Sequence, residues 1–133
     1  MKRLIVLLFL SLFFLTSYAQ TYRYRAQSYA FGERSSYTGN IIWGDWQKCR
    51  VIITIDFDED YIEVYSSRTQ NYVIVGVDRN YYDKDGAQVV DMSAIDEEGI
   101  ECTVKLRVQR DGVAQLYSYY SDIAWVYSNL VRL

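Results

Sequence analysis

A regular alternation of apolar and polar side chains between residues 101 and 120 constrains the fold of this chain more than any other feature. Every second residue from Cys102 to Val108 is apolar, which is the period-two pattern of a strand with one buried face. Asp111-Gly112 follows, a pair that tolerates the backbone angles of tight hairpin turns. Residues 113–120 are again β-branched and aromatic, so the stretch is predicted to form a β-hairpin.

The length of the turn decides which side chains of the return strand face inward, because a shift of one residue reverses every side chain. A two-residue turn would direct Tyr117 and Tyr119 into the interior. A three-residue turn would instead direct Leu116, Ser118 and Tyr120 inward. Both registers place at least one tyrosine inside a narrow barrel, where it leaves little room for a ligand.

Other segments repeat this pattern at intervals of roughly ten residues, and no helical period occurs after residue 20. The predicted strands are residues 21–31, 48–56, 61–66, 70–77, 87–95, 101–109, 113–120 and 123–131. Short acidic turns join most of them, which favours an all-β fold: a single antiparallel meander of about eight strands. A closed or nearly closed β-barrel is expected because it leaves no exposed strand edges; a β-sandwich is the alternative.

Two segments depart from the simple alternation. Residues 70–77 are almost all apolar or aromatic, which is typical of a strand covered on both faces. Residues 32–47 show no clear period and are predicted to be a loop that covers one end of the sheet.

The amino-terminal segment has the pattern of a secretory signal peptide, residues 1–19. A basic start precedes the apolar run Leu4–Leu15, and small residues at Ser17 and Ala19 favour cleavage before Gln20. The alternative, a membrane-spanning helix, needs about 20 apolar residues. No cysteine follows the cleavage site to carry a lipid, so residues 20–133 are expected to be one secreted or periplasmic β-domain without a membrane anchor.

Composition argues against several classes of function. Two of the 14 basic residues belong to the signal peptide, which leaves 12 against 17 acidic residues and a net charge of −5. Nucleic acid and anionic lipid recruit basic surfaces, so neither is expected as the partner. The sequence contains no histidine, the commonest general base and metal ligand, and we predict neither enzymatic activity nor a cofactor.

Each of the two cysteines, Cys49 and Cys102, falls on an inward-facing position in the alternation of its strand. Both are expected near the same end of the barrel. In an extracytoplasmic protein they are candidates for a disulfide. Their strands lie four apart in the predicted barrel, and a disulfide requires Cα atoms within about 7 Å, so buried free thiols are the alternative. With no histidine to activate it, neither thiol is expected to be catalytic.

The acidic turns are predicted to form two rims, one at each end of the barrel. Residues 58–60, 83–85 and 111 fall at one end, and residues 96–98 and 122 at the other. Asp83-Lys84-Asp85-Gly86 contains a fragment of calcium-loop spacing, but basic residues are interleaved in the same turns. We therefore predict ordinary turn chemistry and no metal site. Asp91 is the exception because it lies within a strand, on the face predicted to point outward.

Gly44-Asp45-Trp46, just before a strand, resembles the Gly-x-Trp motif of lipocalins and related calycin barrels. The resemblance implies an antiparallel barrel with Trp46 at its closed end and an apolar ligand inside. The strands after the motif are shorter than in that family, and no C-terminal helix follows. The chain also resembles short secreted bacterial β-meander proteins of uncharacterised function, which implies a compartment and a fold but no chemistry.

The supply of aromatic residues exceeds what one small core needs, so some are expected at the surface. Besides Tyr37, the candidate binding residues are Trp43, Trp46, Tyr61, Tyr65, Tyr81, Tyr82 and Trp125. Surface aromatics give large contact areas at low entropic cost. We therefore predict a non-catalytic binding module for a protein or a glycan. Two alternatives remain: a lipocalin-like carrier of an apolar ligand, and rings that merely complete a thin core.

Overall fold

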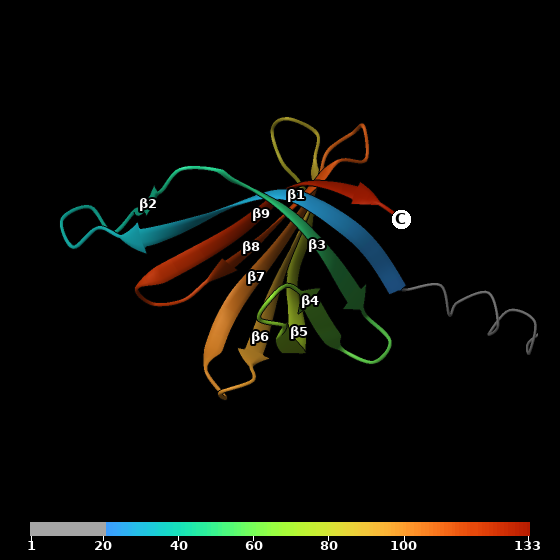
Figure 1. Ribbon diagram of the computed structural model, residues 1–133, viewed down its shortest axis with the longest axis horizontal. Coiled ribbons are helices and arrows are strands. Elements are labelled where there is room, and N and C mark those ends of the chain that lie inside the picture. Colours follow the sequence, from blue (N-terminus) through green and yellow to red (C-terminus); the bar gives the residue numbers. More distant parts are fainter. Residues whose placement is uncertain (1–20) are drawn as a thin grey trace, which may run out of the picture.

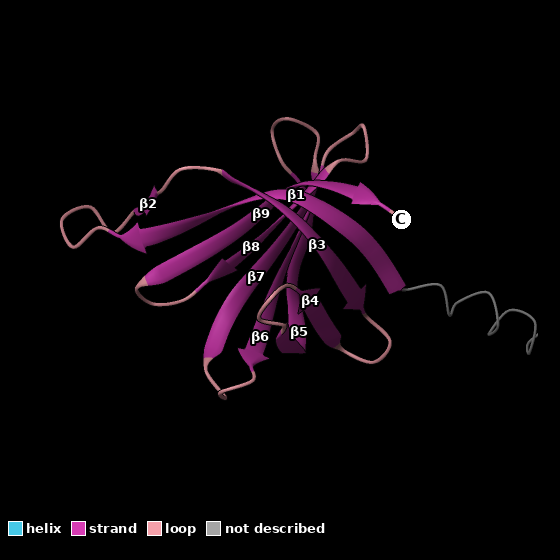
Figure 2. Ribbon diagram, in the orientation of Figure 1, coloured by secondary structure: helices cyan, strands magenta, loops and turns pink. Residues whose placement is uncertain are grey.

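The computed structural model describes residues 21–133; the predicted signal peptide, residues 1–19, and its cleavage site lie outside the described residues. The described chain consists of strands, turns and loops (Figure 2). No helix in this part of the chain is long and apolar enough to cross a membrane. The strands are β1 (Thr21–Arg34), β2 (Ile41–Trp43), β3 (Gln47–Asp56), β4 (Tyr61–Tyr65), β5 (Gln70–Tyr82), β6 (Gln88–Asp96), β7 (Glu101–Val108), β8 (Ala114–Tyr119) and β9 (Ile123–Arg132).

The strands form one antiparallel sheet that closes on itself (Figure 1). From β3 to β9 each strand pairs with the next, and β1 pairs with both β3 and β9. This arrangement is an eight-stranded meander barrel, so the predicted fold class is confirmed and the β-sandwich alternative is not adopted. Closure pairs the strand edges that would otherwise invite aggregation.

The segment predicted to be a loop, residues 32–47, is more regular than expected. β1 continues to Arg34, and the additional strand β2 pairs with its last three residues. β2 lies on the same side of β1 as β3, beyond the point where the β1–β3 pairing ends at Tyr29 and Gln47. The sequence did not indicate these strands, because β1 ends in the exposed polar residues Glu33 and Arg34 and a strand as short as β2 shows no period.

The interior is packed with aliphatic side chains from strands all around the barrel. The largest fully buried ones are Ile53, Ile55, Ile62, Met92, Leu116, Leu130, Val64 and Val104. In the hairpin between β7 and β8, Leu106 lies directly opposite Leu116, so Leu116 and Ser118 face inward. Of the two registers left open by the sequence, the second is therefore the one adopted.

Three hairpins share one turn, the three-residue turn considered as the second alternative for the β7–β8 hairpin: the N–H of the residue before the three turn residues donates to the carbonyl of the residue after them. Gly86, Gly99 and Gly112 each donate a backbone hydrogen bond to the residue three positions earlier, and each has a positive φ between 80° and 91°. Glycine adopts this left-handed conformation without steric cost. At the first two turns an aspartate, Asp83 or Asp96, also accepts two backbone N–H groups through its Oδ1 atom.

The prediction that β5 is covered on both faces is wrong. Val73 and Val75 point outward and are 59% and 64% exposed, whereas their neighbours Tyr72 and Ile74 are buried. The barrel has a single layer, so an apolar outward residue stays in solvent unless another segment crosses over it. In the described structure no segment crosses β5.

The thiols of Cys49 and Cys102 are free, so the disulfide alternative is not realised. Cys102 is buried and Cys49 is half-buried. The two acidic rims lie at opposite ends of the barrel, because the turns alternate between its ends in the meander. Among the described residues, no group of three or more acidic or cysteine side chains is placed to hold a metal ion.

Candidate functional site: a groove between two β-bulges

Two β-bulges flank the middle of β1. On one side, Gln27 of β1 lies opposite two residues of β3, Cys49 and Arg50, because β3 carries one extra residue at this point. A bulge of this kind bends its strand and redirects the side chains next to it.

The second bulge lies in β9, the other neighbour of β1. Gln115 of β8 lies opposite Ser128 and Asn129 of β9, and the β1–β9 pairing is interrupted between Ser128 and Val131. Asn129 has a φ of 54°, the left-handed conformation that asparagine tolerates better than most residues. The two bulges therefore interrupt the sheet on both sides of the same short stretch of β1.

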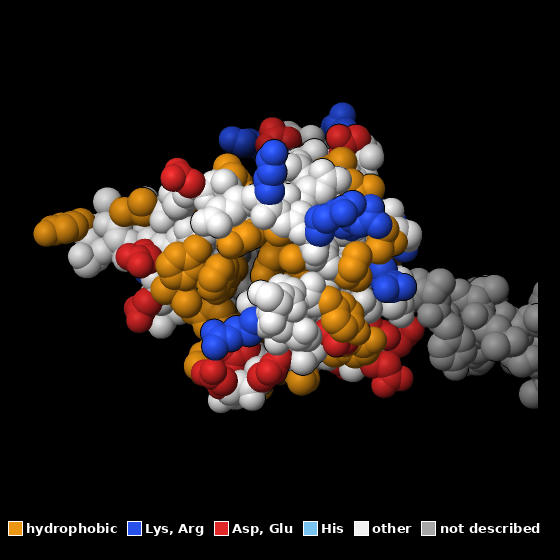
Figure 3. Space-filling model, viewed as in Figure 1, with side chains coloured by type: hydrophobic (Ala, Val, Ile, Leu, Met, Phe, Trp, Pro, Cys, Tyr) orange, Lys and Arg blue, Asp and Glu red, His pale blue; other side chains and the backbone are white. Residues whose placement is uncertain are grey.

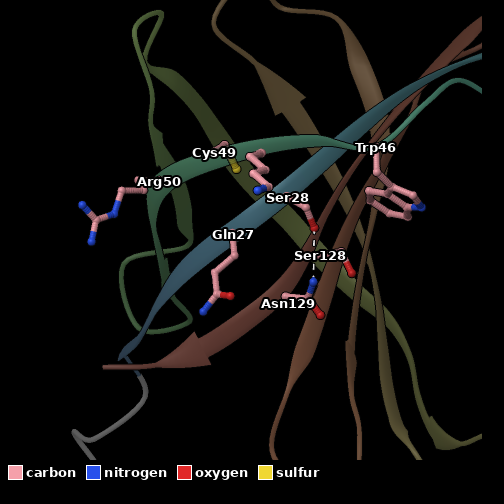
Figure 4. A pocket seen from close by; sticks show the side chains of 8 residues that line it. Gln27, Ser28, Trp46, Cys49, Arg50, Ser128 and Asn129 are labelled. Atoms are coloured by element: carbon pink, nitrogen blue, oxygen red, sulfur yellow. Dashed lines mark hydrogen bonds between the residues drawn. The ribbon is translucent and has the colours of Figure 1, made fainter.

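A surface groove of about 910 Å³ lies over this interruption (Figure 4). Its lining is contributed by β1, by β3 with the residue just before it, and by β9. The lining residues are Gln27, Ser28, Trp46, Lys48, Cys49, Arg50, Ser128 and Asn129. Most of them belong to the bulges or lie beside them, so the groove is a direct consequence of the irregular strand pairing.

Trp46 forms one end of the groove, and its side chain is 58% exposed. Its indole extends from the start of β3 toward β9, whereas Arg50 extends away at the opposite end (Figure 4). The lipocalin resemblance implied that Trp46 closes the barrel from inside. In the structure Trp46 lies on the outer surface instead. Its neighbour Gln47 is the partner of Tyr29 and points inward, so Trp46, the adjacent residue, points outward.

The middle of the groove is polar. Asn129 Nδ2 donates a hydrogen bond of 3.3 Å to Ser28 Oγ, which joins the β9 bulge to β1. The amide of Gln27 and the hydroxyl of Ser128 make no hydrogen bond to any side chain or backbone group of residues 21–133. Amide and hydroxyl groups both donate and accept, so the groove offers mixed hydrogen-bonding capacity.

The lining residues do not suggest bond-breaking chemistry. The only thiol in the groove is that of Cys49, whose pKa is raised by burial, so it stays protonated at neutral pH. Its sulfur lies 3.7 Å from the Ala26 carbonyl oxygen. The groove-lining residues include no carboxylate that could act as a general acid or base. Such a site can bind and orient a ligand.

The other predicted aromatic residues do not gather here. Trp43 covers β1 and meets Tyr117 with ring centroids 6.1 Å apart. Trp125 faces inward at the end of the barrel that carries the acidic turn at residues 96–99, against Phe31 at 4.7 Å and Tyr29 at 6.4 Å. Trp125 also lines a cleft of about 660 Å³ at that end.

The four predicted tyrosines lie on other parts of the barrel wall. Tyr61 and Tyr65 lie on the outward face of β4. At the far end of β5, Tyr81 is covered by Arg79, whose guanidinium lies 4.3 Å from the ring centroid, and Tyr82 is 74% exposed. The predicted binding aromatics therefore form no single patch.

The sequence did not reveal the polar members of the groove: Gln27, Ser28, Lys48, Arg50, Ser128 and Asn129. Their one visible signal was the polar pair Ser128-Asn129 inside the otherwise apolar last strand. A polar pair breaks the alternation where a bulge inserts a residue.

Comparison with family models, with curated proteins and with solved structures found no significant match for this chain.

Proposed function

We propose that this protein is a non-catalytic extracytoplasmic module that binds a glycan in the bulge groove. The observation that carries the proposal is the exposed Trp46 indole beside four amide and hydroxyl side chains, two of which, Gln27 and Ser128, have no partner within residues 21–133. Ligand sites commonly combine an aromatic surface with a few polar groups that fix orientation. A sugar ring meets both requirements, because it has apolar C–H faces and hydroxyls that donate and accept.

A glycan fits this surface better than a protein does. Protein interfaces concentrate their binding energy in clustered aromatic and arginine side chains at the centre of a contact of about 800 Å² per partner. Here the exposed aromatics Trp46, Tyr65 and Tyr82 lie just before β3, at the end of β4 and at the end of β5, and none of the ring contacts within residues 21–133 joins them. A single indole in a polar groove suits a narrow ligand instead.

An apolar ligand carrier is the second candidate, and one observation supports it. A cleft of about 550 Å³ opens at the end of the barrel where β1 begins, and its lining includes Phe57, Leu106 and Val108. Arg132 crosses this cleft, with its guanidinium 4.4 Å from the ring centroid of Tyr22. The packed interior below it limits how deep such a ligand could reach.

Affinity electrophoresis through gels that contain one soluble polysaccharide each tests the proposal. The panel is dextran, laminarin, hydroxyethyl cellulose, polygalacturonate, alginate and chondroitin sulfate. At least one should retard the protein, and Trp46→Ala should weaken that retardation roughly tenfold or more, as loss of a central aromatic does. The control Tyr82→Ala removes a ring outside the groove that is even more exposed, 74% against 58% for Trp46, and should change nothing.

Two results would contradict the proposal: no retardation by any member of the panel, or equal losses in Trp46→Ala and Tyr82→Ala. Enhanced fluorescence of N-phenyl-1-naphthylamine without any glycan retention would instead support the carrier, provided that substitution of Phe57 by serine abolishes it.

A further inference from the structure

Basic side chains gather at the groove although the chain as a whole carries a net negative charge, and they indicate what kind of ligand the groove can bind. Lys48 and Arg50 line the groove from β3, and both are exposed. Arg23 and Arg25 extend the same outward face along β1, because they alternate with the inward residue Tyr24. Figure 3 shows Lys and Arg side chains over β1 and β3, while most Asp and Glu side chains lie around the periphery.

These charges are not neutralised by the protein itself. Asp45 precedes Trp46, and Glu63 faces outward on β4. Even so, among residues 21–133 the only ion pairs within 4.0 Å are those of Arg107 with Asp83 and Asp85. The groove therefore presents free cationic groups on a protein whose acidic residues are mostly confined to turns at the barrel ends.

The two ends of the groove differ in chemistry: one end is aromatic and the other is cationic. Trp46 lies at one end of the groove and Arg50 at the other, with the Arg50 side chain directed away from Trp46 (Figure 4). A ligand that uses both must place a ring face on the indole and an anionic group near the guanidinium. The volume of about 910 Å³ lies near the top of the range for small-molecule sites, roughly 300–1,000 Å³, which suits several sugar rings.

From this arrangement we infer that the ligand is an acidic oligosaccharide, bound through a ring on Trp46 and a carboxylate or sulfate at Lys48 and Arg50. The inference rests on the proposed glycan function and specifies its ligand class. A guanidinium suits the anion because it donates two parallel hydrogen bonds to carboxylate or sulfate. Binding falls as salt rises, because both basic groups are exposed and screened.

A matched pair of polymers tests the charge requirement: polygalacturonate and its fully methyl-esterified form, which keeps the backbone and removes the negative charge. Retardation by polygalacturonate should exceed that by the ester roughly tenfold or more at 50 mM salt. Arg50→Gln and Lys48→Gln should each weaken binding of the acidic polymer by a larger factor than binding of its neutral ester. Lys84→Gln is the control, since it removes an exposed positive charge from a turn outside the groove.

Each outcome separates the ligand class from the proposed function. Retardation by dextran, laminarin or hydroxyethyl cellulose that equals or exceeds retardation by every acidic polymer would overturn the acidic ligand and leave glycan binding intact. Equal losses in Arg50→Gln and Lys84→Gln would also overturn it, because binding would then follow net charge. Failure of all six polymers contradicts the glycan function itself.

Discussion

Trp43 lies across the bare backbone of Gly32 and meets the edge of the Tyr117 ring. The two residues 32 and 43 are direct cross-strand partners, and the missing side chain at position 32 leaves the space that the indole occupies. The ring of Tyr117 in turn stacks on that of Tyr119, with centroids 5.8 Å apart and planes 3° from parallel. This aromatic cover buries outward-facing Ala124, the β9 partner of Gly32.

Gly32→Ala is therefore expected to destabilise the protein. A Cβ at this position would lie 2.5 Å from Ile41 Cγ2 and 2.9 Å from Trp43 Cε3, so both side chains would have to move. Overpacking of this kind typically costs about 1–3 kcal/mol. Urea denaturation measures the loss in the free energy of unfolding.

Gly76→Ala provides the matched control on β5. A Cβ there meets nothing within 4 Å, and the backbone needs no positive φ. This variant should be as stable as the parent, or more stable by about 0.4–1 kcal/mol because the unfolded chain loses freedom. Equal destabilisation of both variants would show that the aromatic cover is unimportant.

Two valines of opposite burial test the orientation of the strands. Val64 on β4 is 1% exposed and Val75 on β5 is 64% exposed. Val64→Ala should cost about 2 kcal/mol from lost burial and the cavity left behind. Val75→Ala should stay within about 0.5 kcal/mol of the parent. A large loss in Val75→Ala, measured by urea denaturation, would mean that another surface covers β5.

Much of the barrel could be predicted from residue alternation, because a half-buried strand records its inward face in every second residue. Inward Val104 and Leu106 of β7 illustrate this. The same rule failed at Val73 and Val75, where outward residues are apolar although solvent reaches them. Apolarity shows which residues can be buried; the layers of the fold decide which ones are.

The groove was less predictable than the barrel. Trp46 was identified as a binding candidate because aromatic residues exceeded the needs of the core. Gln27, Arg50 and Asn129 were not, because their proximity depends on extra residues in β3 and β9. A bulge changes register by one residue and leaves composition unchanged, so local sequence carries little record of it.

Alkaline pH should destabilise the fold through Cys102. Burial raises the pKa of its thiol to about 11, whereas an unfolded chain loses this proton near pH 8.5. The unfolded state then binds fewer protons, so stability is complete below about pH 8.5 and falls as pH rises toward 11, by up to about 1.4 kcal/mol per pH unit. Cys102→Ala should flatten the dependence of the urea midpoint between pH 8.5 and 10. An unchanged slope would contradict a protonated, buried thiol.

Asn129 offers a way to separate binding from folding. Asn129→Gly removes the amide and keeps the left-handed backbone that φ 54° requires. It should therefore weaken polysaccharide retardation and leave the urea midpoint nearly unchanged. Asn129→Ala removes the same amide but strains the backbone, which costs about 1–2 kcal/mol. Full retention of binding in Asn129→Gly would exclude the amide from the site.

Alkylation of Cys49 in the Cys102→Ala variant tests most directly whether the ligand occupies the groove. Cys49 lines the groove and is half-buried, so a bound chain should shield its thiol from iodoacetamide. With whichever polysaccharide of the panel retards the protein most, at saturation, we expect the alkylation rate to fall roughly tenfold or more, in line with the occupied fraction. Trp46→Ala in the same background should clearly reduce this protection at the same polymer concentration. An unchanged alkylation rate while the polymer is demonstrably bound would contradict a glycan site in the bulge groove.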